Sequence, residues 1–217
     1  MKFLQVLGWA TLAMALPSPA PLDDNVAVVE HLEKRATVTG TVVSALDQLN
    51  TAVTANLAAV QTAIVQIQNA NSVAAVVTAT AAIRSNYQAI VNAITDATAQ
   101  IFAVTTGATG GVAAGIVGLT QQEANDLANA IQQIVVLVRN IRATLTVTAT
   151  ALGPNVTAAT AAETAAIRTA ITPFVAPIQA LASAIAAASA SATLTITGLN
   201  AAASGLVTIS KQLAAGV

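Results

Sequence analysis

Apolar residues recur at alternating steps of three and four, the spacing that places side chains on one stripe of an α-helix. Two such stripes lie before residue 105. The first is formed by Val42, Leu46, Leu49, Val53, Leu57, Val60, Ile64 and Ile67, and the second by Val76, Thr80, Ile83, Tyr87, Ile90, Ile94, Ala97, Ile101 and Val104. Because only a short segment around Asn69 and Asn71 separates them, they predict two long amphipathic helices joined by a turn.

Two further stripes follow in the second half of the chain. They consist of Leu127, Ile131, Ile134, Val138, Ile141 and Leu145, and of Ile167, Ile171, Phe174, Ile178, Leu181 and Ile185. A shorter stripe of Leu199, Ala203, Leu206, Ile209 and Leu213 comes after Gly198. Residues 193–197 alternate like a strand, but no partner strand is evident, so we interpret them as a weak helix or a connector.

The boundaries of the third and fourth helices are marked by their own signals. Thr120 with Glu123, and Thr160 with Glu163, both fit the capping box of a helix N-terminus. Gly153-Pro154 should end the third helix, because glycine tolerates left-handed geometry and proline cannot continue the hydrogen-bond ladder.

Two segments depart from this regular pattern. Pro173 and Pro177 lie inside the fourth stripe, which predicts a kink that opens space beside Phe174. Residues 105–119 hold five glycines among apolar residues, without the Gly-Lys-Ser/Thr ending of a phosphate-binding loop. We interpret them as a flexible apolar loop that caps one end of the fold or touches a surface.

Long amphipathic helices joined by short links pack side by side. The sequence therefore predicts an all-α protein, an up-and-down bundle of four to five long amphipathic helices. With no cysteine in the chain, disulfides do not hold it together, and burial of apolar side chains must do most of that work.

The N-terminal region indicates secretion and processing. Met1-Lys2 and an apolar run to Leu16 are typical of a signal peptide over residues 1–15, and the run is too short to span a bilayer, which needs about 20 residues. Residues 16–35 are rich in proline and acidic residues and end in Lys34-Arg35. They are interpreted as a pro-segment cut at that dibasic pair, although a solvated charge run is the alternative. The mature domain is then 36–217.

Charge and chemistry restrict the function of that domain. The charges of its five basic and five acidic residues cancel, so it lacks the excess of positive charge that binds nucleic acid. The domain contains no cysteine, and the single histidine of the chain, His31, precedes the dibasic pair and so lies outside it. The domain therefore offers no histidine triad and no metal site of the usual ligands. We expect the mature chain to have no enzymatic activity, no cofactor and no transmembrane segment.

A few polar positions carry alternatives. Glu123 and Asp126 are one turn apart, but helix capping explains them better than acid–base chemistry. Arg139 and Arg142 share a helical face, where they hold a lipid carboxylate or, as the simpler interpretation, are solvated or paired with acids of a neighbouring helix. Asn155-Val156-Thr157 is a sequon, so Asn155 is a candidate glycosylation site.

The leader, the short pro-segment ending in Lys-Arg and the cysteine-free helical domain together resemble a known family. So do the segments LTQQEANDLANAIQQIVVLVRNI and AAETAAIRTAITPFVAPIQALASAI. The chain resembles the hydrophobic-surface-binding protein A family of filamentous fungi, a group that includes cell-wall galactomannoproteins. The resemblance covers roughly residues 38–185 and consists of apolar spacing rather than a fixed signature.

This resemblance implies a secreted or wall-associated protein that adsorbs to hydrophobic surfaces, where a secreted esterase is a candidate partner. In some relatives it implies a fatty acid held between the helices. The sparse charge, the glycine-rich connection and the Ala/Ser/Thr-rich tail depart from that pattern and put an internal cavity in question.

Three hypotheses follow. The chain is an adsorber to apolar surfaces, a lipid-binding module, or a structural wall mannoprotein whose glycans matter most. Candidate lipid or surface contacts are Ile94, Ile101, Phe102, Ile141, Phe174 and Ile178.

Overall fold

The computed structural model describes residues 23–106, 120–192 and 199–215, and every regular element in these ranges is a helix. The helices are α1 (Asp23–Gln68), α2 (Val73–Thr106), α4 (Gln121–Ala151), α5 (Gly153–Ala192) and α6 (Leu199–Ala214). The all-α bundle predicted from the apolar stripes is therefore confirmed. Thr105 and Thr106 of the predicted glycine-rich loop belong to α2, and the rest of that loop, 107–119, and the strand-like stretch at 193–197 lie outside the described residues.

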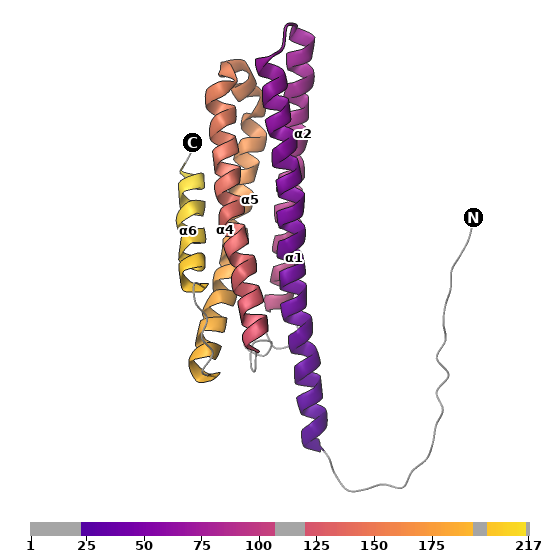
Figure 1. Ribbon diagram of the computed structural model, residues 1–217, viewed down its shortest axis with the longest axis vertical. Coiled ribbons are helices and arrows are strands. Elements are labelled where there is room, and N and C mark those ends of the chain that lie inside the picture. The colour runs from indigo at the N-terminus through magenta and orange to yellow at the C-terminus, as the bar shows by residue number, and fades with distance from the viewer. Residues whose placement is uncertain (1–22, 107–119, 193–198, 216–217) are drawn as a thin grey trace, which may run out of the picture.

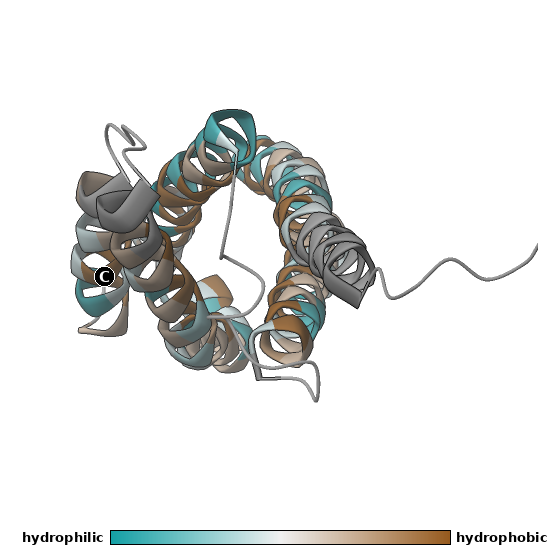
Figure 2. Ribbon diagram, turned by 90° about the horizontal axis from the view of Figure 1, so that it is seen from below, coloured by the Kyte–Doolittle hydropathy of each residue, from teal (hydrophilic) through white to brown (hydrophobic). Residues whose placement is uncertain are grey.

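The helices run alternately up and down, and α1, α2, α4 and α5 form a ring (Figures 1 and 2). Around this ring, α1 contacts α2, α2 contacts α5, α5 contacts α4, and α4 contacts α1. Helices α2 and α4 are thus diagonal to each other. The shorter helix α6 packs against both α4 and α5 on the outside of the ring.

The apolar stripes form the core of this ring. Every member of the third and fourth stripes is buried, and so are most members of the first and second. Only Ile67, Val76 and Val104 are half-buried, because they lie near helix ends. A spacing of three and four residues therefore sufficed to identify the buried face of each long helix.

Helix α1 begins earlier than the pattern predicts. The first apolar stripe starts at Val42, but the helix already begins at Asp23 and runs without a break to Gln68. Lys34 and Arg35, the predicted processing site, therefore lie inside α1. Cleavage between this pair and Ala36 remains a prediction, and a protease that needs extended substrate would have to act on locally unwound chain.

One of the two predicted capping boxes is confirmed. The Glu123 amide donates to Thr120 Oγ1 at 3.2 Å, and the Thr120 amide donates to Glu123 Oε2 at 2.8 Å. The second prediction is wrong, because Thr160 is buried within α5 and its hydroxyl donates to the Val156 carbonyl. A Thr-x-x-Glu sequence inside a continuing helix satisfies the same pattern without beginning a new helix.

The real start of α5 is the tight turn at Leu152–Pro154. Gly153 has φ +74°, a left-handed conformation, and Pro154 follows it in the first turn of α5. The Thr157 hydroxyl donates to the carbonyl oxygens of Gly153 at 2.9 Å and Ala149 at 3.3 Å, which ties the two helices together across the turn. The predicted end of the third helix at Gly153-Pro154 is confirmed.

The prolines inside α5 do not interrupt it. Pro173 is exposed and Pro177 is buried, and the helix continues through both to Ala192. Each proline lacks an amide, so the carbonyls of Thr169 and Pro173 lose their usual helical donors. Figure 1 shows α5 passing behind α4 toward the end where α6 packs.

The turn gives a testable pair of substitutions. Gly153→Ala should lower the free energy of unfolding by about 1–2 kcal/mol, since a Cβ is unfavourable at positive φ. Gly40→Ala is the matched control: Gly40 lies inside α1 and its added Cβ would meet no atom within 4 Å, so stability should rise by about 0.5–1 kcal/mol. Urea denaturation measures both, and a neutral Gly153→Ala variant would contradict the turn.

Candidate functional site

The six predicted contact residues do not form one surface. Five of them are at most 2% exposed and belong to the core: Ile94, Ile101, Ile141, Phe174 and Ile178. Phe102 is 57% exposed on the outside of α2. In the folded bundle only Phe102 is therefore positioned to touch a flat external surface, whereas the other five would meet a lipid only inside the core.

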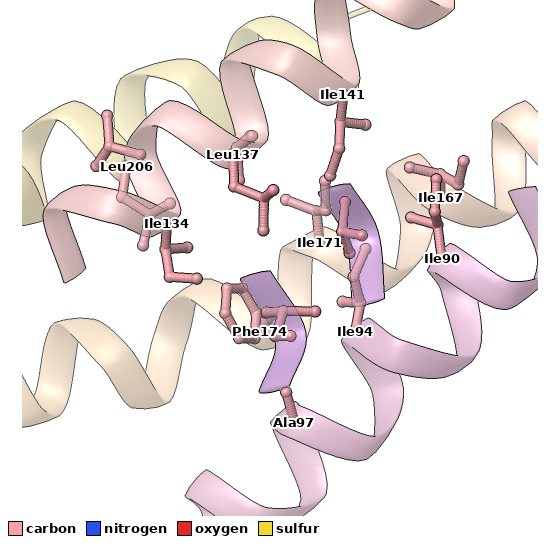
Figure 3. Packing of buried hydrophobic residues seen from close by; sticks show 14 of the residues in the cluster. Ile90, Ile94, Ala97, Ile134, Leu137, Ile141, Ile167, Ile171, Phe174 and Leu206 are labelled. Carbon is pink, nitrogen blue, oxygen red and sulfur yellow. The ribbon is translucent and has the colours of Figure 1, made fainter. Parts of the chain in front are cut away.

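The core around Phe174 is filled by side chains. Figure 3 shows the Phe174 ring pointing into the cluster, with Ile94 of α2 and Ile134 of α4 also directed inward. Phe174 itself is 1% exposed, so its ring occupies the space that the predicted proline kink was expected to open. None of these five core side chains lines either of the two grooves described below.

One polar network crosses the core. The Tyr87 hydroxyl of α2 lies 2.5 Å from Thr148 Oγ1 of α4, which in turn donates to the Thr144 carbonyl at 2.9 Å. Because the single Thr148 proton is used by Thr144, Tyr87 is the donor to Thr148. Since α2 and α4 are diagonal in the ring, this long side chain joins helices whose backbones do not touch in the described residues.

The charged groups are few, and one pair joins two helices. Arg84 Nε of α2 donates to Glu163 Oε1 of α5 at 2.8 Å, and the two side chains are 54% and 12% exposed. Glu163 therefore has an ion-pairing role and not the capping role that its sequence pattern predicted. Its second oxygen, Oε2, and the Nε atom of Arg168 are buried without a hydrogen-bond partner among the described residues.

Arg139 and Arg142 line a shallow groove between α4 and α6. The groove has a volume of about 570 Å³ and an apolar floor that includes Val147 and Ile209. Arg142 Nη1 donates to Gln212 of α6 at 2.8 Å. In the described part of the chain neither arginine pairs with an acid, and Arg139 is exposed, so of the simpler interpretation the solvated alternative fits and the paired one does not.

Three of the six exposed large hydrophobic residues in the described part of the chain lie at the end of the bundle that carries the α1–α2 turn. Val65 of α1 is 53% exposed, and Val73 and Val77 of α2 are 81% and 62% exposed. We call these three residues the valine end. The apolar period does not predict it, because the period identifies only the buried stripe, and Val73 and Val77 lie one turn apart and off that stripe.

Beside the valine end, α2 and α5 form a groove of about 400 Å³. We call it the α2–α5 groove. It is lined by Val73, Val76, Val77, Thr80, Ala81 and Arg84 of α2 and by Asn155, Val156 and Ala159 of α5. The predicted glycosylation site, Asn155, is exposed and stands at the rim of this groove.

Among the described residues, two helices are long and apolar enough to cross a membrane by length and composition: α4, and α5 from Gly153 to Ala187. Both supply a buried stripe to the ring, and 44% of the apolar window of α4 and 39% of that of α5 is buried in the bundle. Within the described ranges, no group of three or more His, Cys, Asp or Glu side chains gathers as a metal site would require.

Tyr87 provides a pH-dependent test of the buried network. Burial raises the pKa of Tyr87 to about 12 from 10.0. A raised folded-state pKa means that its stabilising contribution is complete below pH 10 and is lost as the pH approaches 12. The free energy of unfolding should therefore fall by up to about 3 kcal/mol over that interval.

Tyrosinate absorbance reports this group directly, because the chain has one tyrosine. Tyr87→Phe is the control: it should lose the decline between pH 10 and 12, and lose about 1 kcal/mol at neutral pH with the hydrogen bond. A tyrosine that titrates at its ordinary pKa in the folded protein would contradict the buried network.

Searches with this chain against protein-family models, curated proteins and solved structures gave no match.

Proposed function

We propose that this chain is a secreted, non-catalytic protein that adsorbs to hydrophobic surfaces through the outside of its folded bundle. The observation that carries the proposal is the valine end, where Val73 is 81% and Val77 is 62% exposed. It lies in a stretch, residues 48–83, that contains no charged residue. Large apolar side chains exposed at one end of the molecule favour contact with apolar material, because that contact removes them from water.

The polar residues of this outer surface also favour contact with apolar material. The Thr62 hydroxyl donates to the Ala58 carbonyl at 3.0 Å, and the Thr78 hydroxyl donates to the Ala74 carbonyl at 3.0 Å. Asn56 Nδ2 donates to the Ala52 carbonyl at 2.7 Å. Because these donors are already satisfied within their own helix, removing water from them costs less than removing it from a free ammonium or carboxylate.

The wider surface continues the same pattern. Residues 169–210 contain no charged residue either, and Thr169 and Thr208 donate to carbonyls of their own helices. A surface of satisfied hydroxyls and methyl groups is weakly hydrated. It supports adsorption that depends little on ionic strength, since few charges are available to be screened.

A lipid-binding function is the second candidate, and the groove at Arg139 and Arg142 favours it. Two guanidinium groups without an acidic partner in the described residues border an apolar floor that includes Val147 and Ile209. Such a groove matches an amphiphile with a carboxylate head and an apolar chain. This version of the proposal places the ligand on the outside of α4 and α6, because the interhelical core is filled.

A structural role in the cell wall is the third candidate. Its support is limited to the exposed sequon at Asn155 and to the resemblance to wall galactomannoproteins. Secretion and a wall location belong to the same proposal.

The adsorption proposal is tested with a Val73→Ser/Val77→Ser variant on a methyl-terminated surface. Adsorption measured by quartz crystal microbalance should weaken at least about tenfold, because full burial of one valine contributes about 1.5 kcal/mol and 1.4 kcal/mol is a tenfold change. Both positions are exposed, so thermal unfolding should change little.

Val136→Ser is the matched control, since Val136 is 52% exposed but lies on α4, away from the valine end. It should adsorb nearly as well as the unmodified protein at both low and high salt. Equal adsorption of all three proteins would remove the valine end from the proposal, and failure of the unmodified protein to adsorb would overturn the proposed function.

A further inference from the structure

The α2–α5 groove combines an apolar lining with a glycosylation sequon at its rim. Its volume of about 400 Å³ falls in the range of about 300–1,000 Å³ typical of ligand pockets. Val73 and Val77 contribute to its α2 side and are the two most exposed of the large hydrophobic residues. The protein thus leaves apolar surface in water beside a residue suited to carry a bulky polar group.

Asn155 is held in place by its neighbours in the sequon. Val156 is 5% exposed and belongs to the core, and the Thr157 hydroxyl is bound to the carbonyls of Gly153 and Ala149. The first turn of α5 is therefore anchored on either side of the Asn155 position. The Asn155 side chain itself is exposed and contributes to the wall of the groove.

We propose that Asn155 carries an N-linked glycan whose innermost N-acetylglucosamine lies in the α2–α5 groove over Val73 and Val77. In the attachment step, the Asn155 amide nitrogen bonds to the anomeric carbon of a lipid-linked oligosaccharide. The bond from that carbon to the lipid diphosphate breaks, the diphosphate leaves with the electron pair, and the amide nitrogen loses one proton.

The chemistry of the groove fits this occupant. A hexosamine ring has a face of C–H groups and an acetamide methyl, which can cover valine side chains, while its hydroxyl groups stay in water. Ala81 and Ala159 are small, so they leave room for a ring between the two helices. Arg84 uses its Nε to bind Glu163, and its half-exposed guanidinium retains further N–H donors for sugar hydroxyls.

The glycan would also weaken adsorption of the protein to apolar surfaces. This consequence rests on the proposed function. The glycan covers the α2 side of the valine end, so the glycosylated protein should remain in water more readily than the bare protein. Loss of the glycan uncovers Val73 and Val77 together.

The test uses the full chain secreted from yeast. Mass spectrometry of the glycopeptide gives the occupancy of Asn155, and endoglycosidase H then trims the glycan to a single N-acetylglucosamine. In protein with labelled valine methyl groups, nuclear Overhauser effects are measured from the sugar acetyl methyl. We expect contacts to Val73 and Val77 and none to Val136, the exposed valine on α4.

An unoccupied Asn155 would overturn the proposal, and so would an occupied Asn155 whose sugar shows no contact with either valine. Asn155→Gln removes the glycan but leaves Thr157 and its hydrogen bonds intact, and it should adsorb to the methyl-terminated surface more strongly than the trimmed glycoprotein. Sugar–valine contacts without any difference in adsorption would uphold the glycan position and count against the valine end as the adsorbing surface.

Discussion

Burial of apolar stripes is the interaction on which this structure depends. The chain has no cysteine, and the described residues contain a single ion pair between helices, Arg84 with Glu163. Four long helices must therefore be held mainly by buried side chains such as Ile94, Ile141 and Ile171, which converge from α2, α4 and α5 (Figure 3). Apolar contacts are non-directional, so they do not by themselves select one arrangement of the helices. That selection depends on the shapes of the packed side chains, on the few buried hydrogen bonds and on the turns.

Tyr87 supplies one of those specific ties. Its hydroxyl reaches Thr148 across the diagonal of the ring, so α2 and α4 are fixed in register although they are not neighbours. A buried polar group of this type is satisfied only when both helices are correctly placed, and a slip of either would leave it unpaired. The tight turn at Gly153 and the close approach of Gly205 in α6 to Val135 in α4, where an added Cβ would lie 3.6 Å from the valine, add further constraints on shape.

The same lack of charge shapes the outside of the bundle. Threonine and asparagine take the places where soluble helices commonly carry lysine and glutamate, and hydroxyls such as those of Thr78 and Thr169 donate to carbonyls one turn earlier. These hydroxyl groups therefore donate their protons within their own helix and not to water. The outer surface is then able to lose water against apolar material at low cost, and the valine end concentrates that property at one end of the molecule. A glycan on Asn155 would restore hydration there.

The sequence by itself determined the fold class and the buried face of each long helix, because a period near 3.6 residues is a local property that survives into the core. It also determined the Thr120 cap and the Gly153 turn, which depend on neighbouring residues alone. Tertiary structure decided the rest. Five of the six proposed contact residues are core residues, Glu163 pairs with Arg84 instead of capping a helix, and Val73, Val77 and Asn155 meet in one groove. The apolar period shows which side chains of a helix are buried. Only the packing of α2 against α5 decides which exposed side chains of the two helices become neighbours.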